Sequence, residues 1–572
     1  MIKYQYYKNH SIICVFLFKI IQMKSTTDTF ELTGQIIDLV KGRIFPGTVI
    51  VDNGIITDIR EEKVSAARFI LPGLIDAHVH IESSMLVPSE FARLAVVHGT
   101  VATVSDPHEI ANVLGIEGIR YMIENGKSVP FKFFFGASSC VPATGFETSG
   151  AVLGVNDIET LLKLDEIKYL AEMMNYPGVL FQDQEVMAKL ALALKYNKPV
   201  DGHAPGLMGD DVKKYIEAGI TTDHECFTME EALAKIEHGM KIQIREGSAA
   251  KNFDSLIGLL DTHPDFVLFC SDDKHPNDLV RGHINEMLKR AFKLGYDPIK
   301  VLQCCILNPI NHYNLEIGKL QKGDPADIIV VDNLEDFNVL QTYVNGVKVA
   351  ENGISLINPE KDVAPNRFVA TKVTASDFAI AYTGKNIKVI EALEGQLITN
   401  TIVVEPKVAN GKMVSDVDRD ILKITVINRY EKASPSIAFI RNFGLKKGAI
   451  ASTVAHDSHN IIAIGVDDES LARAINLVVE NTGGISVVSD DFEHILPLPV
   501  AGLMSNNNGY QVASDYEKID AMAKLLGTKL HAPFMTLSFM ALLVIPQLKI
   551  SDKGLFDGST FSFTGLEVTE QV

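Results

Sequence analysis

The sequence predicts an α/β protein built on a (β/α)8 TIM-type barrel, with a small β-sandwich domain from two chain segments and a C-terminal α+β domain. Eight apolar runs that read as buried strands recur between residues 71 and 315, and most are followed by a helix-like segment. Polar residues gather where these runs end, which is the end of a barrel that carries active sites. Two similar strand-rich stretches, one on each side of the runs, predict the flanking β domain.

The predicted barrel strands are short and apolar, as buried parallel strands are. Helix-like patterns stand between most of them, for example from Asp183 and from Asp210. A doubly wound open sheet is the rival arrangement, but it usually carries a glycine-rich phosphate loop, and none follows Ile75. We therefore expect a closed barrel over 71–315, with strands ending at 76–80, 103–106, 135–138, 170–172, 200–203, 222–224, 242–245 and 268–272.

The small β domain is predicted from residues 28–70 and 316–365. The first segment carries a hairpin signal, Asp52-Asn53-Gly54, between apolar runs, and the second returns to a similar strand pattern. The chain would leave this domain, form the barrel and come back.

The two ends of the chain read differently. Residues 366–572 mix strand-like runs with a helix-like segment from Glu469, and we expect a separate α+β domain. Residues 1–27 contain an apolar run that is too short to cross a bilayer, and we interpret them as an N-terminal extension.

Composition narrows the choice of function. The 572 residues are 47% hydrophobic and 22% charged with a net charge of −19, and no cluster of Lys and Arg that could bind a nucleic acid appears. Six cysteines without a CxxC pair fit a reducing compartment. We expect a cytoplasmic protein that binds neither nucleic acid nor membrane. The PCxxC, HExxH and GxSxG patterns of three other hydrolytic schemes are absent.

The most informative motif is the pair His78 and His80. Two residues apart on a strand, their side chains point to the same side, as does that of Asp76. Such a pair alone is a weak signal, but this one follows a predicted buried strand at its carboxyl end.

Further groups of the same kind end four other predicted strands. Glu172 ends the fourth, His203 the fifth, His224 the sixth and Asp272 the eighth. A single histidine at a strand end is usually structural, but six such groups at one end of one barrel predict a metal site. Four imidazoles with two carboxylates suit Zn, Fe or Mn and do not suit Ca or Mg.

Longer motifs extend this interpretation. PGLIDAHVH and the closing IGKLQKGDPADIIVVD resemble the amidohydrolase superfamily. The strings HVHIESSMLVPSEFA, GTVATVSDPHEIANVLG, VDGHAPGL and FCSDDKHP are more specific, and they resemble the bacterial adenine deaminases. The resemblance covers almost the whole chain from about residue 28.

The resemblance implies two divalent metal ions, Mn or Fe, with Zn as a further option. His78 and His80 would hold one metal, Glu172 would bridge, and His203 and His224 would hold the second. Asp272 would be a ligand and the proton shuttle.

The implied reaction is the hydrolytic deamination of adenine to hypoxanthine and ammonia by metal-activated hydroxide attacking C6, in purine salvage. The alternative is another amidohydrolase that acts on a cyclic amide or an N-acyl substrate with the same site. A homo-oligomer, a dimer, is the family expectation.

A second acid or base would help to protonate the base and its leaving amine. We assign this catalytic role to Glu82 and Glu225, and substrate binding to Asp106 and His108, with plain hydrogen bonding to the ligands as the alternative for all four. Glu225 directly follows a predicted ligand, so on a regular strand it would point away. The HDSHN run from His456 would either close over the barrel mouth or cap a loop, and we expect the loop cap.

Overall fold

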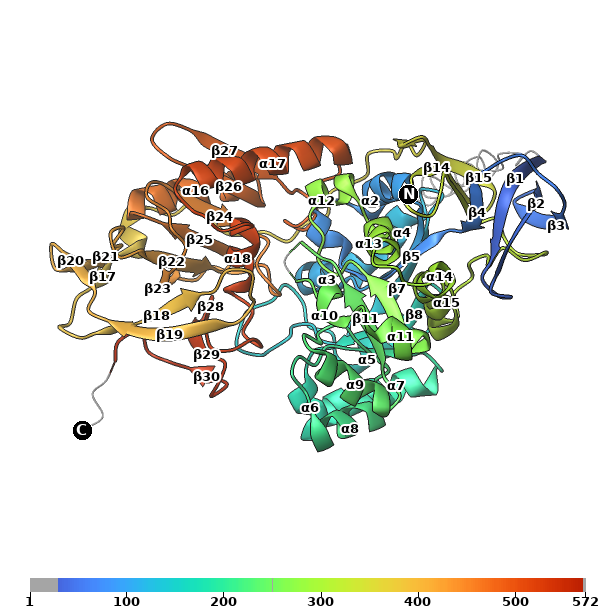
Figure 1. Ribbon diagram of the computed structural model, residues 1–572. Coiled ribbons are helices and arrows are strands. Elements are labelled where there is room, and N and C mark those ends of the chain that lie inside the picture. The colour runs from blue at the N-terminus through green and yellow to red at the C-terminus, as the bar shows by residue number, and fades with distance from the viewer. Residues whose placement is uncertain (1–28, 249, 569–572) are drawn as a thin grey trace, which may run out of the picture.

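The computed structural model describes residues 29–248 and 250–568, which form three domains (Figure 1). The barrel lies between the small β domain and the C-terminal domain (Figure 1). The predicted extension 1–27 lies outside the described residues. Within the described part of the chain, no helix is both long and apolar enough to cross a membrane.

The barrel consists of eight parallel strands in chain order, as predicted. Two hydrogen-bonded sheets, β5 to β9 and β10 to β12, make up the ring. Thr221 N donates to Val200 O at 2.9 Å at one junction, and Asp272 N donates to His78 O at 2.9 Å at the other. The strands are β5 (Leu74–Val79), β6 (Thr100–Ser105), β7 (Lys132–Ala137), β8 (Ile167–Met173), β9 (Val200–Gly202), β10 (Thr222–Asp223), β11 (Lys241–Arg245) and β12 (Val267–Cys270).

Helices surround these strands and bury one face each. In α7 (Gln184–Lys195), the Asp183 side chain accepts from two backbone N–H groups of the first turn, and Leu190 faces the core. The other barrel helices are α2 (Pro88–Ala95), α3 (His108–Leu114), α4 (Ile116–Gly126), α5 (Val155–Leu162), α6 (Tyr176–Leu180), α8 (Gly209–Glu217), α9 (Met229–Glu237), α10 (Phe253–Leu256), α11 (Leu259–Thr262), α12 (Pro276–Arg281), α13 (Ile284–Lys293), α14 (Pro298–Cys305) and α15 (Leu307–Tyr313).

The small β domain is one eight-stranded sheet that curls into a sandwich. Phe30 stacks on Tyr343 with ring centroids 5.0 Å apart, and Ile56 N donates to Asp324 O at 2.9 Å, so distant parts of the sheet meet. Asn53 and Gly54 both have positive φ, as the predicted tight hairpin requires. Its strands, in sheet order, are β16 (Ile354–Ser355), β15 (Val347–Glu351), β14 (Val339–Val344), β13 (Ile328–Val331), β4 (Phe69–Pro72), β1 (Phe30–Asp38), β2 (Arg43–Asp52) and β3 (Ile55–Glu61).

The C-terminal domain has a mixed sheet with helices packed on it, as predicted. Its eight strands, in sheet order, are β19 (Thr399–Val404), β18 (Ile387–Ala392), β23 (Ser436–Arg441), β22 (Ile421–Ile427), β25 (Ile461–Gly465), β24 (Ala449–Ser452), β26 (Gly484–Val488) and β27 (Glu493–Pro497). The helices are α16 (Asp468–Glu480), α17 (Gly509–Leu525) and α18 (Pro533–Phe539). Two small sheets complete it, β17 (Ile380–Ala381) with β21 (Lys412–Val414) and β20 (Lys407–Ala409), and β28 (Leu548–Ser551) with β29 (Gly554–Asp557) and β30 (Ser562–Phe563).

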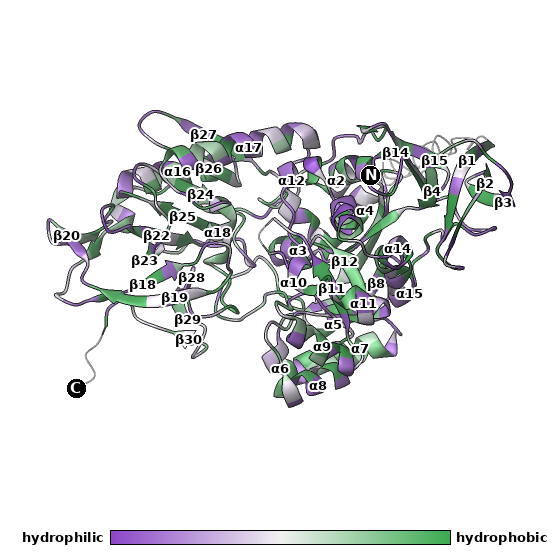
Figure 2. Cartoon of the chain, viewed as in Figure 1, coloured by the Kyte–Doolittle hydropathy of each residue, from purple (hydrophilic) through white to green (hydrophobic). Residues whose placement is uncertain are grey.

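Hydrophobic residues dominate the central strands of both the barrel and the C-terminal sheet (Figure 2). All six residues of β5 and all seven of β22 are buried. Burial of this extent rigidifies the strands, and the barrel strands fix the positions of the polar residues that follow them.

Candidate metal centre and active site

The six predicted metal ligands converge at the carboxyl ends of the barrel strands. His78 Nε2 and His80 Nε2 lie 3.2 Å apart, and His80 Nε2 lies 3.3 Å from Glu172 Oε1 and 3.4 Å from Asp272 Oδ1. All six are buried except His203, which is half-buried.

Glu172 stands at the centre of this cluster. Its other oxygen, Oε2, lies 2.9 Å from His203 Nδ1 and 3.3 Å from His224 Nε2. The rings of His78 and His224 stack with centroids 4.2 Å apart. The carboxylate therefore lies between the first histidine pair and the second, where a bridging ligand would have to be.

The donor set fits divalent metal ions. Burial lowers the pKa of His80, but Asp272 and Glu172 outweigh it and raise the pKa well above its ordinary value. The carboxylates thus favour positive charge at this point, which is what a metal ion supplies. Burial, together with His224 and His80, lowers the pKa of His78 well below its ordinary value, so this imidazole is neutral and its lone pair is available.

Arg245, which the sequence analysis did not select, holds two of the predicted carboxylates. It donates to Glu225 Oε1 and Oε2 at 2.5 and 2.9 Å and to Asp272 Oδ2 at 2.6 Å, and it is fully buried at the end of β11. Burial raises the pKa of Asp272, but Arg245, together with His80 and His224, outweighs it and holds the pKa well below its ordinary value. Asp272 is therefore an ionised carboxylate at neutral pH.

Glu225 does not point away from the cluster. β10 ends at Asp223, so the alternation of a regular strand no longer applies at Glu225. Its Oε1 lies 3.5 Å from His224 Nε2 and 3.6 Å from His203 Nδ1.

Asp106 and His108, predicted to bind substrate, lie beside the ligands. His108 Nδ1 lies 3.2 Å from Asp106 Oδ2 and 3.5 Å from Glu172 Oε1, and His80 Nδ1 lies 3.2 Å from Asp106 O. These atoms are close enough together to hold an ion as well, so the geometry is compatible with either a substrate contact or a metal contact.

Glu82 follows β5 in a short 3₁₀ turn, Ile81–Ser84. Its Oε1 accepts from Ile110 N at 3.1 Å, while its buried Oε2 has no hydrogen-bond partner among the described residues. Burial and the neighbouring Glu109 raise the pKa of Glu82 to about 7.

Two aspartates support the cluster from behind. Asp201 accepts from Tyr313 and Thr222, each at 2.8 Å, and faces His78 Nδ1 at 3.9 Å. Asp76, which shares a strand face with His78, accepts instead from Ser271 N at 2.9 Å and pairs with His283. Asp76 therefore joins β5 to the end of β12.

The HDSHN run of the C-terminal domain lies against the barrel mouth. His456 Nδ1 lies 2.8 Å from Glu109 Oε1, His459 Nε2 contacts Glu109 Oε2, and Asp457 Oδ1 lies 3.9 Å from His108 Nε2. His459 Nδ1 also accepts from Ala455 N, which is the loop cap that we expected. Both roles left open by the sequence are thus present in one loop.

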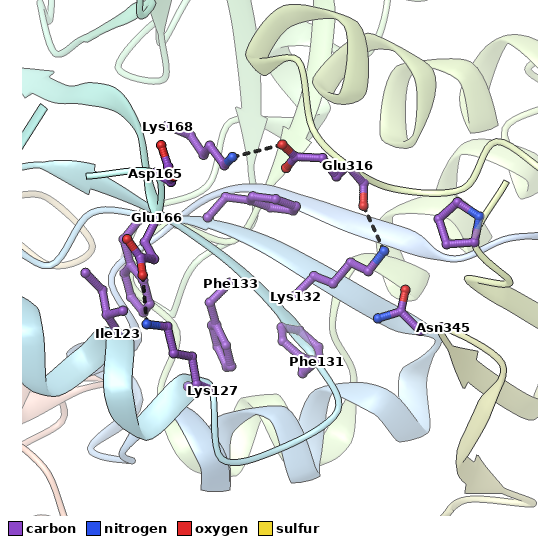
Figure 3. Close-up of a pocket in the computed structure, with 14 residues that line it drawn as sticks. Ile123, Lys127, Phe131, Lys132, Phe133, Asp165, Glu166, Lys168, Glu316 and Asn345 are labelled. Carbon is purple, nitrogen blue, oxygen red and sulfur yellow. Dashed lines mark hydrogen bonds and ion pairs between the residues drawn. The ribbon is translucent and has the colours of Figure 1, made fainter. Parts of the chain in front are cut away.

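A separate cavity of about 580 Å³ lies at the opposite end of the barrel, where β7 begins (Figure 3). Its lysines are paired with carboxylates, as Lys127 is with Glu166 and Lys168 is with Glu316 (Figure 3). This cavity has no part in the cluster of predicted ligands.

Comparison with known proteins identifies the family. The model of the amidohydrolase family matches residues 69–349, and the model of the adenine deaminase C-terminal domain matches residues 396–562. An adenine deaminase of Sulfurovum sp. (strain NBC37-1) is 54% identical over 93% of this chain and 99% of its own length. The chain belongs to the adenine deaminase family.

Other relatives agree with this assignment. The adenine deaminase of Salinibacter ruber is 54% identical over 94% of this chain and 98% of its own length, and that of Borreliella burgdorferi is 49% identical over 94% and 99%. The predicted resemblance to bacterial adenine deaminases is therefore confirmed over nearly the whole chain.

Proposed function

We propose that this chain hydrolyses adenine to hypoxanthine and ammonia at the barrel mouth. The proposal is carried by a sequence identity of about one half to adenine deaminases over nearly their full length. The buried cluster of four histidines and two carboxylates agrees with it. The small-molecule substrate fits a site that is buried and lined by polar groups.

We propose that the cluster holds two divalent metal ions, Mn or Fe, with Zn as a further option. His78 and His80 would hold one, His203 and His224 the other, with Glu172 between them and Asp272 as an additional ligand. When bound, such ions lower the pKa of water and supply a nucleophile at neutral pH.

The chain's own carboxylates would move the protons. Water adds to C6 of adenine, and Asp272, which Arg245 keeps ionised, takes a proton from it. Asp272 would pass that proton to N1 of the ring. Glu82, whose Oε2 accepts no hydrogen bond from the described residues, would deliver a proton to the departing amino group and take back the proton of the new C6 hydroxyl, so that ammonia leaves and the C6 carbonyl forms. Glu225 and Arg245 would orient Asp272, while Asp106 and His108 would hold the purine.

We further propose a cytoplasmic homodimer. Analytical ultracentrifugation tests the dimer: a mass near 125 kDa supports it, because one chain weighs 62.7 kDa.

The assay of the proposed function is ultraviolet detection of hypoxanthine from adenine, with protein grown with iron chelated and manganese supplied. Guanine, a cyclic amide and an N-acetyl amino sugar serve as competing substrates. Turnover of adenine alone supports the proposal. Turnover of the cyclic amide or the N-acyl compound, with none of adenine, supports the alternative amidohydrolase activity.

A further inference from the structure

The mouth loop, residues 455–460 between β24 and β25, brings the C-terminal domain into the barrel mouth. Glu109, in the first turn of α3, contacts both His456 and His459 of this loop. Asn460 donates to Thr148 O of the barrel at 2.8 Å. All of these side chains are buried or nearly so, which makes the loop a wall of the mouth.

The two histidines of the mouth loop differ in charge. His459 Nδ1 accepts from the Ala455 N–H at 3.2 Å, so its proton lies on Nε2, which contacts Glu109. Burial lowers the pKa of His459 to about 4, so this ring is neutral. Burial would lower the pKa of His456, but Glu109 outweighs it and raises the pKa to about 9. Glu109 is thus neutralised by one charged histidine and held by a second, neutral one, which fixes the loop in place.

This arrangement places Asp457 beside His108. Its Oδ1 lies 3.7 Å from His456 Nδ1 and 3.9 Å from His108 Nε2, whose other nitrogen lies 3.5 Å from the predicted ligand Glu172. Only the imidazole ring of His108 therefore lies between this carboxylate and the cluster of predicted metal ligands.

The second oxygen of Asp457 has no protein donor. Oδ2 is buried, and no hydrogen-bond partner for it exists among residues 29–248 and 250–568. Asp457 as a whole is 2% exposed. Buried carboxylate oxygens nearly always accept a hydrogen bond, so a donor from outside the protein belongs here.

We propose that Asp457 is a specificity-determining residue that accepts the imidazole-ring N–H of the purine, and that Glu109, His456 and His459 position it. This inference rests on the proposed function. Adenine has two kinds of N–H donor, the amino group on C6 and the ring N–H on N7 or N9. C6 has to react among the predicted ligands, and Asp457 comes from the outer wall, so the ring N–H is the donor that faces it.

The test compares wild type with Asp457→Ala and the milder Asp457→Asn. Steady-state kinetics with adenine should show KM raised about 10- to 100-fold with kcat within about threefold, the effect of one lost charge-assisted hydrogen bond to the substrate. Asp552→Asn is the matched control, because Asp552 joins the two domains through Thr148 N and Asn428 but does not face His108. We expect its KM to stay near the wild-type value.

A second readout identifies the donor. Hypoxanthine has a ring N–H on its imidazole half and 9-methylhypoxanthine has none, so wild type should be inhibited much more weakly by the methylated base. The ratio of the two inhibition constants should be at least tenfold smaller in Asp457→Ala than in wild type.

Three results would decide the matter. An unchanged KM in both Asp457 variants, or an undiminished preference for the unmethylated base, overturns the inference while leaving the proposed function intact. If Asp457→Ala does not fold, as shown by its melting temperature, Asp457→Asn supplies the same comparison. Absence of adenine turnover in the wild type would overturn the proposed function, and the inference with it.

Discussion

Replacement of Arg245 by Met should disable the site and destabilise the barrel together. Arg245 is buried and binds two carboxylates, Glu225 through two hydrogen bonds and Asp272 through one. Met keeps much of the side-chain volume but removes the positive charge. Two buried carboxylates would then lie close together without their shared cation.

The expected magnitude follows from this geometry. Removing one partner of a buried ion pair costs about 3–5 kcal/mol. Because two carboxylates lose their partner here, we expect the upper part of that range, which corresponds to a fall of about 10 °C or more in the melting temperature of the barrel. The pKa of Asp272 should rise, so that less of it is ionised at neutral pH, and kcat should fall by about 100-fold or more.

Glu225→Gln is the matched control. It removes one carboxylate but leaves Arg245 paired with Asp272, so its loss of stability should be clearly smaller than that of Arg245→Met. Calorimetry of metal-free protein measures the first effect, and kcat of metal-loaded protein measures the second. If Arg245→Met melts within about 2 °C of wild type, a shift of less than about 1 kcal/mol, the proposed charge balance is wrong.

Three further predictions concern other parts of the molecule. Glu82→Gln should lower kcat by about 10²- to 10⁴-fold without changing the metal content, because it removes a proton donor. Steady-state kinetics and metal analysis measure the two effects, and a variant that retains the wild-type kcat would contradict the assignment. The His456–Glu109 pair should stabilise the docked C-terminal domain fully below about pH 6.5 and lose this effect as the pH rises to about 9, because the folded pKa of His456 is raised. Melting temperatures between pH 6.5 and 9 should therefore fall more in wild type than in Glu109→Gln, and an equal fall would refute the assignment. Gly54→Ala should lower the free energy of unfolding by about 1–3 kcal/mol, because Gly54 has φ +79° and a Cβ there would meet a backbone oxygen at 2.4 Å. Gly42→Ala is the control: Gly42 has φ +65° but open space around it, so the loss should be about 1 kcal/mol or less. Equal melting temperatures of the two variants would contradict this prediction.

The sequence was most informative where local pattern determines structure. Buried parallel strands have continuous apolar runs, so all eight barrel strands could be placed, and the polar residues at their ends followed from the architecture. His78 and His80 share a strand face for the same local reason.

What the sequence did not reveal depends on contacts between distant segments. Arg245 was recognised as a strand end, but its bonds to Glu225 and Asp272 depend on how three strands lie side by side. Glu225 was expected to point away because β10 was assumed to continue through it. The contact of His456 with Glu109 joins residues almost 350 positions apart, and no periodicity encodes it.

The most direct test of the account is metal content and adenine turnover measured on the same samples of wild type and Glu172→Gln. Glu172 contacts His80, His203 and His224, so its loss should release at least one of two bound metal ions. We predict two divalent ions per chain and conversion of adenine in wild type, with both reduced together in the variant. Full turnover by wild-type protein stripped of metal, or a Glu172→Gln variant that keeps two ions and normal activity, would contradict it.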